Sequence, residues 1–138
     1  MKFFCAVTFL LSLASVAFAR EESILARVTS YWAGEGSNYA STGERLRAGH
    51  CAVDPNRIPY GSKVVFADGV CTAVDTGSAV VNRKAARLCG RTASQLKAIV
   101  VDRFFETKLE AMAWTNAHPE FMTLQIVPPG SRRDLSEP

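Results

Sequence analysis

Residues 63–77 read KVVFADGVCTAVDTG, and this stretch decides the fold class. Two apolar runs rich in β-branched residues flank Asp68-Gly69, a dipeptide that favours a tight hairpin turn. We therefore expect a strand over residues 63–67 and an antiparallel return strand over residues 70–75. The stretch predicts a β-rich fold.

The return strand ends in a motif with a chemical meaning. Alternation with a period of two places Cys71, Ala73 and Asp75 on one face of that strand. Residues 75–78 then read Asp-Thr-Gly-Ser, which resembles the catalytic loop of aspartic proteases. Such a protease would have to dimerise, because a chain of this length supplies only one such aspartate.

Short apolar runs also occur elsewhere, separated by glycine, aspartate and proline, a pattern typical of a small β-rich barrel. We expect further strands over residues 24–32, 97–105 and 121–127. Two stretches carry capping-box spacing and predict helix starts, at Thr92 with Gln95 and at Thr107 with Glu110. Residues 34–49 are rich in glycine and polar side chains, so they predict a long loop of the kind that is usually functional.

The N-terminal segment has the features of a secretion signal. A positively charged start precedes an apolar run over residues 3–16, and residues 17–19 read Ala-Phe-Ala, a small-x-small cleavage site. We expect residues 1–19 to be removed and the protein to be exported, to a periplasm or outside the cell. One domain over residues 20–130 and a flexible tail over residues 131–138 would remain. The apolar run is too short for a transmembrane anchor, so no stable membrane insertion is expected.

Charge and cysteine content narrow the partners. The chain has 16 basic and 13 acidic residues, and this near balance argues against nucleic acid as a partner. Cys51, Cys71 and Cys89 follow the signal segment, and one pair of them could bridge in an oxidising compartment, although the spacing does not say which. No CxxC or HxxxH spacing is present, so we expect neither a metal nor a cofactor.

Three segments each place an aspartate after two apolar residues. They read AVDPNRIPYGS over 52–62, AVDTGSAV over 73–80 and VVDRFF over 100–105. In this order they resemble the three-aspartate (3D) domain, found in membrane-bound lytic transglycosylase A and in secreted cell-wall proteins. A weaker similarity, through ASTGERL over 40–46, links the chain to rare-lipoprotein-A-type proteins. The resemblance implies a mainly β fold, a single six-stranded double-psi β-barrel with one or two short helices.

The same resemblance implies a function. It implies a monomer that cleaves the β-1,4 bond between N-acetylmuramic acid and N-acetylglucosamine in peptidoglycan and leaves a 1,6-anhydro product. One aspartic acid would act first as acid and then as base. Matched by motif, that residue is Asp102, with Asp75 beside it to raise its pKa and Asp54 as a more distant partner. The rare-lipoprotein-A type would instead give Asp75 the leading role. The residues expected to bind the sugar are Tyr31, Thr76, Gly77 and Ser78.

Some features leave alternatives open. Residues 82–99 look like an inserted helical segment, because Asp75 and Asp102 are further apart here than in the lytic enzyme. Arg103 follows Asp102 directly, and an ion pair between them would lower the pKa of the acid. Asp54 precedes a proline and would also suit a purely structural turn. The main alternative function is a non-catalytic polysaccharide-binding module of the expansin or barwin type, and a third is the dimeric aspartic protease.

Overall fold

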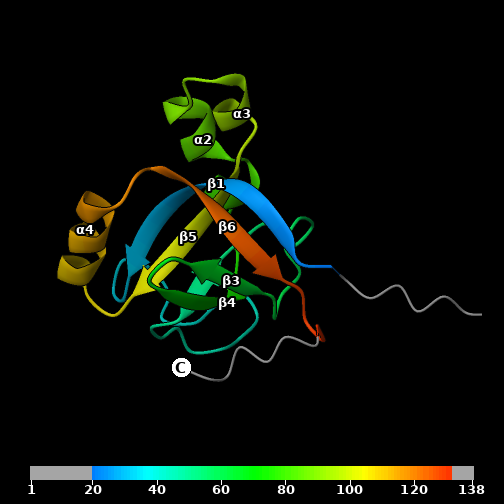
Figure 1. Cartoon of the computed structure of the whole chain (residues 1–138). Helices are drawn as coiled ribbons and strands as arrows, with labels where there is room; N and C mark the ends of the chain where they lie inside the picture. The colour runs from blue at the N-terminus through cyan, green and yellow to red at the C-terminus, as the bar shows by residue number, and fades with distance from the viewer. Residues whose placement is uncertain (1–19, 132–138) are drawn as a thin grey trace, which may run out of the picture.

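The computed structural model describes residues 20–131, so the expected signal segment and the tail from residue 132 onward lie outside the described residues. Within residues 20–131, six strands close into one mixed β-barrel, which confirms the mainly β fold class (Figure 1). The strands are β1 (Glu22–Trp32), β2 (His50–Ala52), β3 (Lys63–Phe66), β4 (Gly69–Asp75), β5 (Ile99–Phe105) and β6 (Phe121–Val127). The helices are α1 (Ser78–Val81), α2 (Lys84–Cys89), α3 (Ala93–Leu96) and α4 (Lys108–Ala117).

The strand order around the barrel is β1-β5-β2-β4-β3-β6, closed by the antiparallel pair β1 and β6. The pairs β1–β5 and β2–β4 are parallel, whereas β2–β5, β3–β4 and β3–β6 are antiparallel. A closed mixed barrel of this kind is compatible with the double-psi arrangement. Five of the strands match predicted segments, and the three-residue β2 was not anticipated.

The predicted hairpin between β3 and β4 is present, but its turn is displaced by one residue. The register pairs Phe66 with Gly69, so the two turn residues are Ala67 and Asp68 rather than Asp68 and Gly69. Gly69 continues the ladder and does not adopt a positive φ, so the turn does not use the conformational freedom of this glycine.

The barrel interior is filled mainly by apolar side chains from all six strands, Cys51 being the one from β2, and by Val53 and Ile58 from the segment between β2 and β3. Burial of each such side chain stabilises the fold by roughly 1.5–3 kcal/mol. Cys51 and Cys71 also lie in this core, and Cys89 lies partly buried on α2. All three are free thiols in this structure, so none of them forms the bridge considered from the sequence.

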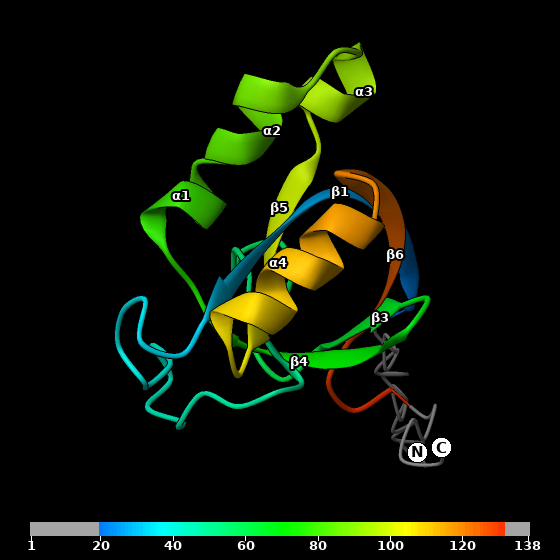
Figure 2. The same cartoon turned by 90° about the vertical axis from the view of Figure 1, so that its left-hand side faces the viewer.

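The helical character predicted for the insert, residues 82–99, is confirmed by α2 and α3, which cover the outside of the barrel. Helices α1, α2 and α3 stack above β1 and β5 (Figure 2). Ala52 and Val100 of the barrel pack against Val80 of α1 and Ala86 of the insert in a second apolar cluster. A Cβ on Gly90 would lie 2.8 Å from the Ala86 oxygen, so the tight turn after α2 requires glycine.

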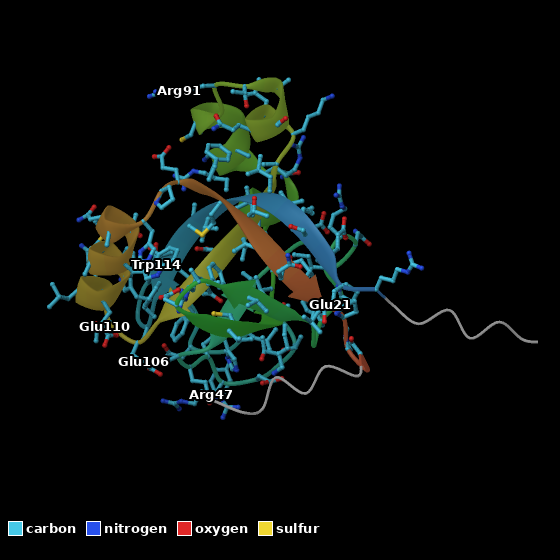
Figure 3. The ribbon with its side chains drawn as sticks, in the orientation of Figure 1. Glu21, Arg47, Arg91, Glu106, Glu110 and Trp114 are labelled. Atoms are coloured by element: carbon cyan, nitrogen blue, oxygen red, sulfur yellow. The ribbon has the colours of Figure 1, made fainter. Side chains whose placement is uncertain are left out.

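Helix α4 closes one end of the barrel. Its predicted capping box is present, since the Thr107 hydroxyl accepts from the Glu110 amide and the Glu110 carboxylate accepts from the Thr107 amide. Trp114 projects from α4 toward the barrel (Figure 3) and packs edge-on against Phe66, with the ring centroids 5.9 Å apart. With this helix, the structure has four short helices where one or two were expected.

Candidate active site

One row of the barrel sheet brings the main candidate residues together. The ladder pairs Thr29 of β1 with Asp102 of β5, and Asp102 with Ala52 of β2. Ala52 in turn pairs with Asp75 of β4. Paired residues on neighbouring strands project to the same face of a sheet, and here that is the outer face, where Ala52 meets the insert. Two strand spacings of about 4.8 Å place the backbones of the two aspartates about 10 Å apart, with only a methyl group between them.

A β-bulge puts Asp75 in this row. Cys51 pairs with Ala73, but the next residue, Ala52, pairs with Asp75, so Val74 is the extra residue. Strict alternation would leave Asp75 on the core face with Ala73, and that expectation is wrong because the bulge turns the carboxylate outward. Bulges often re-aim a side chain beside a functional site in this way.

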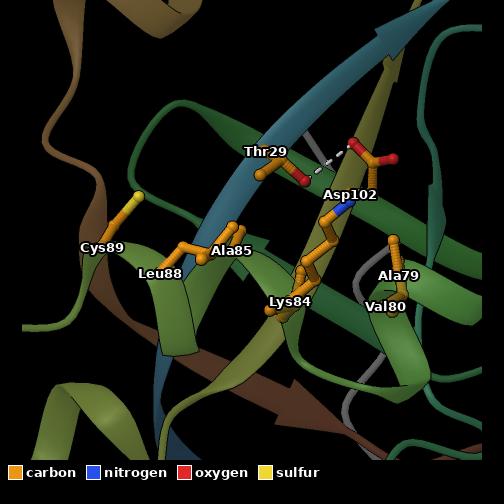
Figure 4. A pocket seen from close by; sticks show the side chains of 9 residues that line it. Thr29, Ala79, Val80, Lys84, Ala85, Leu88, Cys89 and Asp102 are labelled. Carbon is orange, nitrogen blue, oxygen red and sulfur yellow. Dashed lines mark hydrogen bonds between the residues drawn. The ribbon is translucent and has the colours of Figure 1, made fainter.

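Asp102 is the carboxyl group with the most unusual electrostatics. Its pKa is raised to about 7, chiefly because burial disfavours the charged form and also because of the negative charges of Glu35 and Asp75. The Thr29 hydroxyl donates to Oδ1 of Asp102 at 3.0 Å (Figure 4), which opposes the shift by stabilising the carboxylate. Within residues 20–131 no cation forms an ion pair with Asp102.

Arg103 does not neutralise Asp102, contrary to the pairing considered from the sequence. Neighbouring residues of a strand point to opposite faces, so Arg103 turns toward the end of the barrel. There its Nη1 donates to Oδ1 of Asp68 at 2.9 Å. Its guanidinium also lies 4.6 Å from the centroid of the Phe66 ring and 5.0 Å from that of Trp114. Asp102 therefore forms no ion pair with Arg103.

Asp75 is held by three hydrogen-bond donors. The amides of Ser41 and Thr76 donate to its Oδ1 at 2.8 and 2.9 Å, and the hydroxyl of Tyr31 donates to Oδ2 at 3.1 Å. Burial, with the nearby charge of Asp75, raises the pKa of Tyr31 far above its usual range, so this hydroxyl remains a donor. These contacts fix the orientation of the Asp75 carboxylate.

An open cavity of about 490 Å³ lies against both carboxylates. Its opposite wall comes from residues 35–41, part of the predicted functional loop, which runs beside the barrel below α1 in Figure 2. The sugar-binding candidates Tyr31 and Thr76 line it as well. The hydroxyl oxygen of Thr76 is buried without a hydrogen-bond partner in the described structure.

Other sequence candidates lie outside this cavity. Gly77 and Ser78 are exposed at the start of α1 and do not line it. Asp54 accepts a hydrogen bond from the Asn56 amide through its own Oδ1 at 3.0 Å, and its carbonyl oxygen accepts from the amides of Arg57 and Ile58. Asp54 therefore stabilises the turn over residues 54–58, and its carboxylate is not part of the site around Asp102.

Three residues of the site were not identified from the sequence, namely Thr29, Glu35 and Ser41. Thr29 had a readable signal, because it lies two residues before Tyr31 on the same strand and so shares its face. Glu35 and Ser41 belong to the loop, where no periodicity exists to place a side chain.

Within residues 20–131, no group of three His, Cys, Asp or Glu side chains is arranged so that it could hold a metal ion. In the same part of the chain, no helix has the length and apolar character needed to cross a membrane. No family model matches the chain, and no curated protein matches it.

Proposed function

We propose that this protein is an exported peptidoglycan lytic transglycosylase with a double-psi barrel, and that Asp102 is its single acid and base. The observation that carries the proposal is a carboxyl group with a pKa of about 7 and no cationic partner, facing an open polar cavity. An acid catalyst works best when its pKa lies near the working pH. An ordinary aspartate, with a pKa near 3.8, would be almost fully ionised there.

The chemistry needs one group in two protonation states. Protonated Asp102 donates its proton to the glycosidic oxygen, and the bond from C1 of the N-acetylmuramic acid to that oxygen breaks. The resulting carboxylate accepts the proton of the C6 hydroxyl as O6 attacks C1. The products are a 1,6-anhydro-muramyl end and a free 4-hydroxyl on N-acetylglucosamine, and Asp102 returns to its protonated form.

Asp75 would assist without exchanging protons. Its negative charge helps to raise the pKa of Asp102, and its fixed carboxylate is an acceptor for a sugar hydroxyl. Both carboxylates project from one face of the sheet. The single-acid scheme rests on Asp102, because it is the carboxyl group whose pKa is raised toward neutral pH.

The setting of the reaction agrees with the expected export of the chain. Peptidoglycan lies outside the cytoplasm, where a protein released from an N-terminal signal at residues 1–19 would meet it. Neither the cavity nor the chemistry calls for a second copy of the chain, so we propose that it acts as a monomer on the cell-wall glycan.

The test is digestion of purified sacculi by the mature protein, followed by mass spectrometry of the soluble products. We expect muropeptides with anhydro ends, one water lighter than the reducing ones, and their loss in Asp102→Asn. Asp54→Asn is the matched control, because the Asp54 carboxylate serves its own turn.

Other outcomes would replace the proposal. Soluble products with ordinary reducing ends would identify a hydrolase. Binding to sacculi without any soluble product between pH 5 and pH 8 would identify a polysaccharide-binding module of the expansin or barwin type. Cleavage of unfolded protein, blocked by a statine-type inhibitor, would identify a dimeric aspartic protease.

A further inference from the structure

A second cavity borders Asp102 on the side away from the polar one. It has a volume of about 300 Å³, lies between the barrel and the helical insert, and is walled mainly by aliphatic side chains (Figure 4). Among these are Ala85 and Leu88 of α2 and Val100 of β5. Asp102 lines both cavities. A substrate bound at Asp102 could therefore extend one group into the polar cavity and another group into the apolar one.

The insert above this apolar pocket is strongly basic. Residues 82–99 contain five basic residues and no acidic one, namely Arg83, Lys84, Arg87, Arg91 and Lys97. Within residues 20–131, the guanidinium of Arg83 donates to the carbonyl oxygens of Leu96, at 2.9 Å, and Ala98, at 3.5 Å. The other four side chains form no ion pair with any residue of the described range.

Lys84 connects the charge to the pocket. Its side chain is exposed, lines the pocket and extends toward Asp102 in Figure 4. A ligand in the pocket would therefore have aliphatic groups against α2 and an anionic group within reach of this amine. Leu88 adds to the apolar wall although its own side chain is 75% exposed, so a bound ligand would cover it.

These properties select the chemistry of the occupant. A sugar ring would bury its hydroxyls here without partners, which is costly. A nucleic acid backbone has the charge but not the aliphatic groups. We propose that the apolar pocket and the basic insert form a subsite for a short acidic peptide with small aliphatic residues, attached to the sugar beside Asp102. This inference rests on the proposed function, because the peptide is the stem carried by the muramyl residue that is cut.

The subsite can be tested by binding, independently of turnover. The probes are soluble glycan strands that carry stem peptides, and the same strands after an amidase has removed the peptides. Calorimetry is done in an Asp102→Asn background, which prevents cleavage. We expect the peptide-bearing strands to bind about tenfold more tightly, the effect of burying one aliphatic side chain.

Two matched pairs of substitutions locate the preference. Leu88→Ser removes part of the pocket wall, and Leu109→Ser removes a leucine of similar exposure, 80%, from α4. Lys84→Gln removes the amine at the pocket, and Lys97→Gln removes one elsewhere on the insert. Leu88→Ser and Lys84→Gln should each reduce the ratio of affinities for peptide-bearing and peptide-free strands at least threefold. The controls Leu109→Ser and Lys97→Gln should leave this ratio unchanged. All four positions are exposed, so the variants should fold, which thermal unfolding will check.

The outcomes separate the subsite from the enzyme activity. Equal affinity for the two kinds of strand overturns the subsite, even if the wild-type protein releases anhydro products. A preference for peptide-bearing strands without any anhydro product overturns the proposed function and leaves the subsite standing. If Lys84→Gln and Lys97→Gln weaken binding equally while Leu88→Ser has no effect, the insert merely attracts polyanions and the subsite is wrong.

Discussion

Asp68 and Asp102 show what two regions of one barrel do to the same side chain. At the barrel end, burial alone would raise the pKa of Asp68, but hydrogen bonds from Arg103 and Trp114 and the charge of Arg103 lower it below its usual value. On the outer face, Asp102 is much less exposed than Asp68, its partner is the neutral hydroxyl of Thr29, and its pKa rises to about 7. Asp68 is the more exposed of the two and has a cationic partner, and these two differences together give the pKa shifts their opposite directions.

This difference separates a structural carboxylate from one that can react. The Asp68 carboxylate accepts hydrogen bonds from Arg103 at 2.9 Å and from Trp114 at 3.0 Å. Because its pKa is lowered, Asp68 is ionised near neutral pH and has no proton to donate. Asp102 keeps a proton near neutral pH and faces a cavity. Both aspartates lie in or beside a β-strand, and their surroundings give them opposite roles.

The largest effect expected from this comparison is on catalysis. Asp102→Asn should lower the rate of anhydro-product release by about 10²- to 10⁴-fold, the range typical of a general acid. Asp68→Asn should leave the rate within a few-fold of wild type, because Asp68 is remote from the cavity. The rates are measured on sacculi at pH 6, where the acid form of Asp102 predominates. Similar losses in the two variants would break the comparison.

The second effect is on the pH dependence of activity. The acid form of Asp102 is lost above a pH of about 7, so the rate should fall about tenfold per pH unit beyond it. A pH profile of kcat/KM on soluble glycan strands measures this directly. A rate that is flat from pH 6 to pH 9 would show that no group with the pKa of Asp102 controls the reaction.

Stability should follow the same titration with a definite sign. The pKa of Asp102 is higher in the folded protein, about 7, than the ordinary 3.8, so the folded state binds more protons between these values. The free energy of unfolding should therefore fall as the pH rises from about 4 to about 7, by up to roughly 4 kcal/mol. Asp102→Asn should remove this slope and be the more stable protein at pH 8, as measured by urea unfolding. Parallel slopes in both proteins would contradict the assignment.

Removing the aspartate at the barrel end should destabilise the protein, whereas Asp102→Asn should stabilise it at pH 8. Asp68→Ala leaves the guanidinium of Arg103, whose side chain is only 14% exposed, and the indole of Trp114 without their acceptor. We expect a loss of about 1–3 kcal/mol in the free energy of unfolding at pH 8, where Asp102→Asn is stabilising. Urea unfolding of both variants side by side measures the two signs. A stabilising Asp68→Ala would show that these hydrogen bonds do not stabilise the folded protein.

Much of the barrel could be read from the sequence because its signals are local. The β3–β4 hairpin follows from alternating apolar residues around a turn, and α4 begins where Thr107 and Glu110 form their capping box. β2 has only three residues, too few for any period to appear. Its position depends on pairing with β4 and β5, which are distant in sequence.

The site was only partly readable, because it depends on register. The motifs identified Asp75 and Asp102 as candidates. The two side chains lie on the same face of the sheet only because of the bulge at Val74, which no local sequence pattern predicts. The opposite direction of Arg103 followed from strand alternation alone, which the suspected pairing with Asp102 overlooked. Ser41 reaches Asp75 through its backbone amide, so its identity as a serine carries no signal for that contact.

The smallest effect concerns how Asp75 is oriented. Tyr31→Phe removes the hydroxyl that donates to Oδ2 of Asp75 but keeps the ring that packs edge-on against Phe104, at a centroid distance of 5.2 Å. One lost hydrogen bond is worth about 1 kcal/mol, so the rate should fall about fivefold, with the pH profile still governed by a group near pH 7. Kinetics on soluble glycan strands measure both quantities. If Tyr31→Phe were as inactive as Asp102→Asn, the tyrosine hydroxyl would be a reacting group rather than a positioning one.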